Sequence, residues 1–75
     1  MEFSLDQLRV GQCASVMSIQ VSSPLRQRLQ AFGMVPGTCV ACRYRTPGGS
    51  VTALELRSSV IALRTRDMRD IRVRC

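Results

Sequence analysis

The stretch SSPLRQRLQAFGMVPGT, residues 22–38, carries the clearest structural signals in this sequence. Ser22 followed by Pro24 is a typical helix start, because proline lacks a backbone N–H and the first turn of a helix leaves such groups without a helical partner. After this start, apolar side chains recur every three to four residues, which places them on one stripe of a helix that faces a core. They belong to Leu25, Leu29 and Phe32.

The same stretch marks the end of the helix and the turn behind it. Gly33 can adopt, at no steric cost, the left-handed backbone conformation that ends many helices. Pro36 followed by Gly37 favours a type II turn, because the third residue of this turn needs a positive φ. We therefore expect one helix over about residues 24–32, with a tight turn between it and the next strand.

Apolar and polar residues alternate on both sides of this helix, and that period is typical of half-buried β-strands. One such run precedes the helix, at residues 13–19. A loop rich in glycine and proline at residues 46–50 and a tight turn at residues 57–59 divide the part that follows. Four further strands are predicted there, at residues 38–45, 52–57, 61–63 and 71–73.

Five short strands in a chain of 75 residues suit a small, strongly bent and partly open barrel, because a flat sheet of this size would leave its edges exposed. We expect a mostly β fold, one domain over residues 1–75, with one α-helix inserted after the first strand. The core should combine the helix stripe with the inward-facing residues of the strands. These are Val40, Leu54, Ile61, Leu63, Ile71 and Val73, and Tyr44 shares the parity of Val40.

The composition excludes several classes of protein. No run of about 18 apolar residues is present, as a membrane-spanning helix needs, and the first residues lack the pattern of a signal peptide, so we expect a cytoplasmic protein. Histidine is absent and the five acidic residues are dispersed, so the convergent titratable groups of an active site are missing. The sequence therefore predicts a protein that is not an enzyme.

The charge leaves nucleic acid open as an alternative ligand. The net charge is +6 and all 11 basic residues are arginines, and small basic barrels can bind nucleic acid. Only 4% of the residues are aromatic, so the stacking platform that single-strand binders use is missing. Specific nucleic-acid binding is not expected, and nonspecific attraction by a basic barrel is the alternative function.

The four cysteines are expected to be reduced thiols, because no secretion signal directs the chain to an oxidising compartment. Cys39 and Cys42 have the spacing of half a zinc knuckle, but residues three apart on a strand point to opposite faces. Strand parity puts Cys42 in the core and Cys13 and Cys39 on the outside. No cofactor is required, although the outward thiols of Cys13 and Cys39 are candidates for a transition metal bound between two molecules, which would supply the missing ligands.

Three features match a known family. The arginine-bearing helix runs into Gly33-Met34-Val35-Pro36-Gly37-Thr38, a late strand ends in Ala62-Leu63-Arg64, and Met68 precedes the final Ile71-Arg72-Val73. In this combination the sequence resembles, over about residues 5–73, the FeoA family of small proteins that accompany bacterial ferrous iron uptake. Phe32 stands where the family has leucine. Residues 47–51, Pro-Gly-Gly-Ser-Val, stand where the family often has Pro-Leu-Gly-Asp-Pro.

The resemblance implies an SH3-like barrel that serves as a cytoplasmic adaptor. It also implies that the protein binds and modulates a FeoB-type permease, a ferrous iron transporter with a cytosolic GTP-binding domain, and reaches the membrane only through this partner. Similar barrels occur in metal-dependent repressors, so a metal-responsive regulatory module is a further alternative. A weak homo-oligomer also remains open.

The expected partner-binding surface lies where the second predicted strand ends. In a regular strand, Arg43 and Arg45 share an outer face that leads into the loop of Pro47, Gly48 and Gly49. Two guanidinium groups beside an adaptable loop can clamp carboxylates. We therefore expect this edge to meet an acidic surface on the cytosolic part of the permease.

Overall fold

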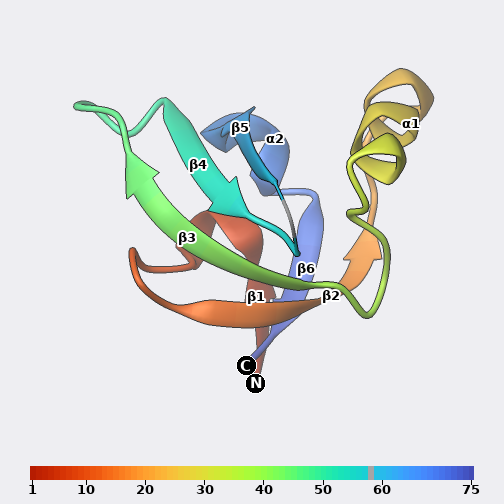
Figure 1. The fold of residues 1–75 in the computed structure, drawn as a ribbon, viewed down its shortest axis with the longest axis horizontal. Helices are drawn as coiled ribbons and strands as arrows, with labels where there is room; N and C mark the ends of the chain where they lie inside the picture. The colour runs from red at the N-terminus through yellow and green to blue at the C-terminus, as the bar shows by residue number, and fades with distance from the viewer. Residues whose placement is uncertain (58) are drawn as a thin grey trace.

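The structure is a computed structural model that describes residues 1–57 and 59–75. The chain forms six strands, two α-helices and one 3-10 helix within these residues (Figure 1). In chain order they are β1 (Glu2–Ser4), η1 (Leu5–Gln7), β2 (Cys13–Ile19), α1 (Ser23–Ala31), β3 (Cys39–Arg45), β4 (Val51–Glu55), β5 (Val60–Arg64), α2 (Thr65–Met68) and β6 (Ile71–Arg74). The tight turn predicted at residues 57–59 includes Ser58, which lies outside the described residues.

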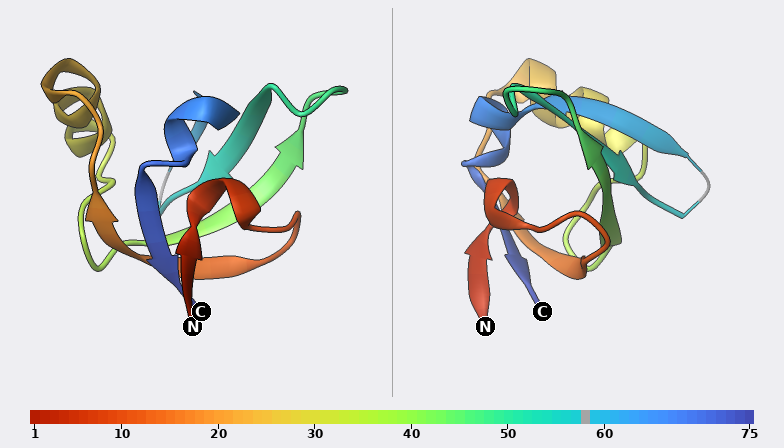
Figure 2. Two further views of the ribbon diagram at one scale, coloured as in Figure 1. Left: turned by 180° about the vertical axis from the view of Figure 1, so that it is seen from behind. Right: turned by 90° about the vertical axis from the view of Figure 1, so that its left-hand side faces the viewer.

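All strands belong to one antiparallel sheet with the order β1-β6-β2-β3-β4-β5. The sheet bends around the core, as the right-hand view of Figure 2 shows, and β1 and β5 form its two edges. The prediction of a mostly β fold with one main helix is confirmed, although this helix follows β2, the second strand in the chain, rather than the first. The strand count is six rather than five, because the three-residue strand β1 pairs with β6 at the other end of the chain.

The termini lie side by side as a result of this pairing (Figure 2). The Cys75 N–H donates to the Met1 carbonyl over 3.2 Å, and the N-terminal ammonium lies 3.4 Å from the Cys75 carbonyl. No helix in the described parts of the chain is long and apolar enough to cross a membrane.

Helix α1 begins and ends within one or two residues of the predicted positions. Ser22 occupies the N-cap position without a side-chain capping hydrogen bond, proline occupies the first turn, and Gly33 follows the C-terminus with φ +91°. Gly37 has φ +93°, as the predicted turn requires. The hydroxyl of Thr38 donates to the Gly33 carbonyl over 2.9 Å and so holds the two ends of this segment together.

One residue of the predicted helix stripe is not in the core. Leu29 is buried and Leu25 is partly buried, but Phe32 is 50% exposed. The helix stands to one side of the sheet (Figure 1) and ends at Ala31, so Phe32 caps it on the solvent side. Met34 is fully buried instead, because the chain turns back at Gly33 and the Met34 N–H bonds the Leu29 carbonyl over 2.9 Å.

A β-bulge in β3 overturns the predicted parity of its last residues. Cys42 lies opposite Leu54 and Tyr44 lies opposite Ala53, so Arg43 is an extra residue without a partner of its own in β4. Beyond the bulge each side chain changes face. Tyr44 is therefore 61% exposed rather than part of the core. The six strand residues predicted to be buried, Val40, Leu54, Ile61, Leu63, Ile71 and Val73, are all buried.

Candidate docking surface

Arg43 lies on the outer face of β3 and faces an acidic side chain of the same protein. Its Nη1 donates to Glu55 Oε1 on β4 over 2.7 Å, and both side chains remain exposed. An exposed ion pair contributes only about 0–1 kcal/mol, because water solvates both groups well when they separate. A carboxylate of a partner can therefore replace Glu55 at small cost.

Arg45 lies on the other face of β3, because it follows the bulge. It pairs with Thr52, which is fully buried, and its Nη2 donates to the backbone carbonyls of Asp6, over 2.9 Å, and Leu8. The prediction that Arg43 and Arg45 share one outer face is therefore wrong. Arg45 instead ties the end of β3 to the 3-10 helix η1.

The loop between β3 and β4 projects into solvent at its tip and is held at its base. Pro47 and Gly48 are exposed, and Gly48 has φ +89°. At the base, the Gly49 N–H donates to the Thr46 carbonyl over 2.8 Å, and the Thr65 hydroxyl donates to the Gly49 carbonyl. The loop tip is thus presented from a fixed frame.

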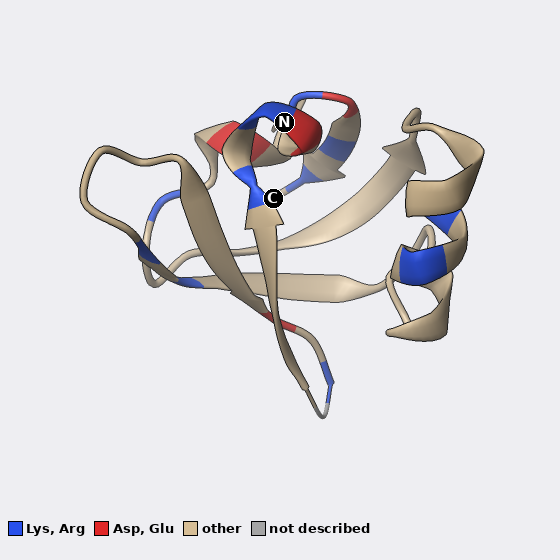
Figure 3. Ribbon diagram, turned by 90° about the horizontal axis from the view of Figure 1, so that it is seen from above, with Lys and Arg blue, Asp and Glu red and all other residues tan. Residues whose placement is uncertain are grey.

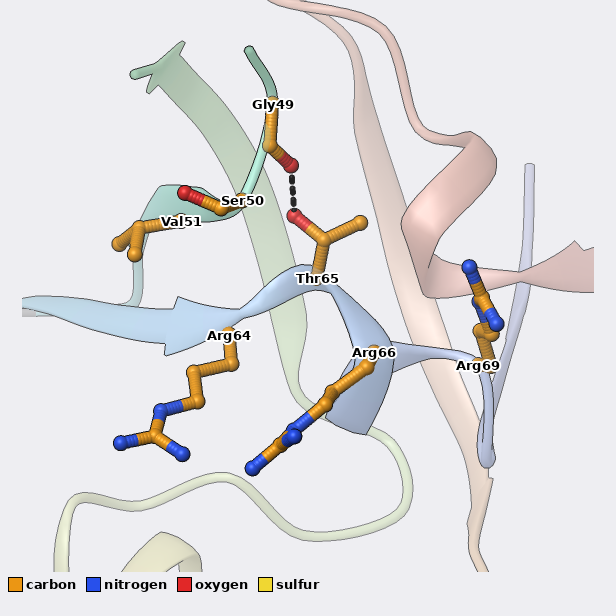
Figure 4. A pocket seen from close by; sticks show the side chains of 7 residues that line it. All are labelled: Gly49, Ser50, Val51, Arg64, Thr65, Arg66 and Arg69. Carbon is orange, nitrogen blue, oxygen red and sulfur yellow. Dashed lines mark hydrogen bonds between the residues drawn. The ribbon is translucent and has the colours of Figure 1, made fainter. Parts of the chain in front are cut away.

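A cavity of about 440 Å³ opens behind this loop. Its lining combines the base of the loop with the end of β5, α2 and the turn after it (Figure 4). Three of the lining side chains are guanidinium groups and none is a carboxylate. The lining residues are Gly49, Ser50, Val51, Arg64, Thr65, Arg66 and Arg69.

Nothing in the sequence alone marks these three arginines as one site. They lie at irregular spacing on a strand end, a four-residue helix and a turn, so no period relates them. Arginines occur on most elements of the fold, as Figure 3 shows, and charge alone did not distinguish the group. In the sequence, Arg64 stands out only as the last residue of the Ala62-Leu63-Arg64 family match.

The cysteines lie where strand parity placed them. Cys42 is 1% exposed, and Cys13, Cys39 and Cys75 are exposed, so the prediction for Cys13, Cys39 and Cys42 is confirmed. Cys13 lies opposite Ala41 and Cys39 opposite Ser15, which puts both thiols on one outer face of neighbouring strands. Among the described residues, no group of three or more histidine, cysteine or acidic side chains is arranged to hold a metal.

The sequence model of the FeoA domain matches residues 3–75. The FeoA protein of Chlorobium tepidum has the same fold, with a TM-score of 0.92 at 24% identity over 96% of this chain and 69% of that chain. A FeoA-like protein of Clostridium acetobutylicum is 28% identical, with a TM-score of 0.82 over 96% of this chain and 84% of that chain.

A third solved structure is the FeoA protein of Stenotrophomonas maltophilia in complex with zinc, described as a prokaryotic SH3 domain protein. It is 25% identical, with a TM-score of 0.82 over 95% of this chain and 88% of that chain. No curated protein matches the sequence. The match to the family therefore spans nearly the whole chain and agrees with the fold.

Proposed function

The chain belongs to the FeoA family, and from this membership we propose that it is an accessory protein of ferrous iron uptake that binds and modulates a FeoB-type GTP-binding permease. The observation that carries this proposal is the family match over residues 3–75. The protein acts as a cytoplasmic adaptor without catalysis, and it reaches the membrane through the permease.

The docking surface for the permease consists of Arg43 and the loop residues Pro47, Gly48 and Gly49. Arg43 contributes because its ion pair with Glu55 is exposed and exchangeable. The loop contributes because its tip is exposed while Thr65 holds its base. Arg45, which was predicted to touch the partner, supports this surface from behind through its bonds to Asp6 and Leu8.

No bound metal is needed for this role. A metal held between two molecules by Cys13 and Cys39 is the arrangement that the outer thiols allow, and it would accompany a homo-oligomer. Metal analysis of the purified protein, with its molecular mass measured by light scattering before and after chelation, tests both points. A chelator-resistant stoichiometric metal would contradict the proposal that none is required.

A binding assay with the soluble cytosolic part of the permease tests the docking surface. We expect Arg43→Glu to weaken capture of that fragment and to lower ferrous iron uptake in a strain that lacks the wild-type protein. Arg72→Glu is the matched control, because Arg72 is exposed on β6 and carries the same change of charge away from the loop. Both variants should keep the thermal unfolding midpoint within a few degrees, since neither arginine is buried.

Two results would contradict the proposal. Equal losses for Arg43→Glu and Arg72→Glu would show that only net charge matters. Loss of oligonucleotide binding in Arg43→Glu, with capture of the permease fragment unchanged, would favour the nucleic-acid alternative.

A further inference from the structure

Three arginine side chains line the cavity behind the β3–β4 loop. Arg64, Arg66 and Arg69 are exposed, and none of them takes part in the two ion pairs that occur among residues 1–57 and 59–75. Asp67 lines the adjoining groove against α1, and Arg64 borders both that groove and the cavity. Asp70 follows Arg69 in the sequence but lines neither. The arginines that line the cavity therefore outnumber the acidic side chains beside it, and the cavity carries an excess of positive charge.

The wall of the cavity is held in place by hydrogen bonds that span the loop and α2. The Thr65 N–H donates to the Ser50 carbonyl over 2.9 Å, and the Thr65 hydroxyl donates to the Gly49 carbonyl. These bonds fix the backbone that carries Arg64 and Arg66. A ligand consequently meets arginines on a preorganised frame, which lowers the entropic cost of binding.

The three guanidinium groups do not converge on one point. Figure 4 shows the side chains of Arg64 and Arg66 extending to the same side of the ribbon, whereas Arg69 lies on the far side of α2. A single small anion cannot reach both places at once. The arrangement suits a ligand that carries several negative groups at intervals along a chain.

The surroundings favour a polypeptide over a nucleic acid. No aromatic side chain lines the cavity, so bases have nothing on which to stack. Arg64 ends β5, an edge strand that pairs only with β4 in the described sheet. An extended polypeptide passing Arg64 would meet the unpaired backbone groups of that edge.

We propose that the cavity bounded by Arg64, Arg66 and Arg69 binds carboxylate side chains of an acidic, extended protein segment. Arg64 and Arg66 take one carboxylate between them, and Arg69 takes another further along the segment. Guanidinium groups suit this role because they bind carboxylates through two parallel hydrogen bonds. The proposal concerns the chemistry of the segment and does not depend on which protein carries it.

An NMR titration of the full-length, 15N-labelled protein tests the proposal. The probe is a capped synthetic peptide with three glutamates separated by glycines, and the control peptide has glutamine in their place. We expect saturable shifts of the Arg64, Arg66 and Arg69 side-chain N–H signals and of the backbone amides of residues 49–51. The glutamine peptide should cause none of these shifts.

Matched variants identify the groups that bind. Arg64→Gln combined with Arg66→Gln should weaken binding of the glutamate peptide at least about tenfold, since hydrogen bonds to charged groups of this kind are lost. The control combines Arg26→Gln with Arg72→Gln, which removes two charges outside the cavity. This control should change the affinity for the glutamate peptide by no more than about threefold, because it only lowers the net positive charge of the protein. Thermal unfolding of each variant checks that the fold is retained.

Several outcomes would overturn the proposal. Equal weakening by both double variants would assign the binding to net charge alone. Saturation of the arginine signals by inorganic phosphate at a lower concentration than by the peptide would assign the cavity to phosphate. Tighter binding of a thymidine oligonucleotide to the same signals would assign it to nucleic acid. The peptide titration contains no permease. A negative titration would therefore not contradict the proposed permease binding, which the capture assay with the permease fragment tests separately.

Discussion

The guanidinium of Arg45 and the backbone carbonyl of Asp6 share a hydrogen bond of 2.9 Å, although the two residues lie 39 positions apart. The same nitrogen also donates to the Leu8 carbonyl. The bulge at Arg43 makes this contact possible, because it turns Arg45 toward η1 instead of outward with Arg43. One inserted residue thus separates an arginine that supports the fold from one that is open to a partner.

Replacing Arg45 should therefore cost stability, whereas replacing Arg43 should not. We expect Arg45→Gln to lower the free energy of unfolding by about 1–3 kcal/mol, because two carbonyls of η1 lose a charged donor. Arg43→Gln should lower it by about 0–1 kcal/mol, since its ion pair is exposed. Urea unfolding followed by circular dichroism measures both, and equal losses would contradict the different placement of the two side chains.

Replacing Leu29 should also cost much more stability than replacing Phe32, although both residues belong to the predicted helix stripe. Leu29→Ala should lower the free energy of unfolding by about 2–5 kcal/mol, because it empties part of the core. Phe32→Ala should cost less than about 1 kcal/mol, since the residue is already 50% exposed. If Leu29→Ala does not fold, Leu29→Met, which keeps the volume, should fold and serve for the comparison. A loss at Phe32 as large as that at Leu29 would place the ring in the core.

Gly33 should tolerate substitution poorly for a reason that lies in the backbone alone. A Cβ at this position meets nothing within 4 Å, but φ is +91°. We expect Gly33→Ala to cost about 1–2 kcal/mol, because side chains other than glycine disfavour that conformation. Gly33→Asn should cost less, since asparagine adopts positive φ more readily. Thermal unfolding compares the two variants, and an unchanged midpoint in Gly33→Ala would show that the turn can rearrange.

The thiols should separate into two classes of reactivity in the native protein. Cys13, Cys39 and Cys75 are exposed and should react with iodoacetamide directly, while Cys42 should react only when the protein unfolds. Timed alkylation with peptide mass analysis measures each site, and denaturant is expected to bring Cys42 to the rate of Cys39. Equal alkylation rates for Cys39 and Cys42 without denaturant would contradict the assignment of these two side chains to opposite faces of β3.

Local sequence was enough to predict features that depend on neighbouring residues. The helix from Ser23 to Ala31 follows from Ser22 and Pro24 at its start. The positive φ of Gly33 follows from the missing Cβ, and the inward face of Cys42 follows from the period of two along a strand. The block at residues 33–38 could also be matched to a known family from local sequence, because the geometry of its turn is specified by the residues that form the turn.

Features that depend on contacts between segments far apart in the chain could be found only from the folded structure. The bulge at Arg43, the pairing of β1 with β6 and the exposure of Phe32 arise from how strands and helix fit around one core. Arg64, Arg66 and Arg69 border one cavity because Thr65 ties α2 to a loop about 16 residues earlier, a contact that no local period encodes. A bulge or a long-range hydrogen bond is selected by the total packing energy of the fold, and the residues on either side of it carry too little of that energy to specify it alone.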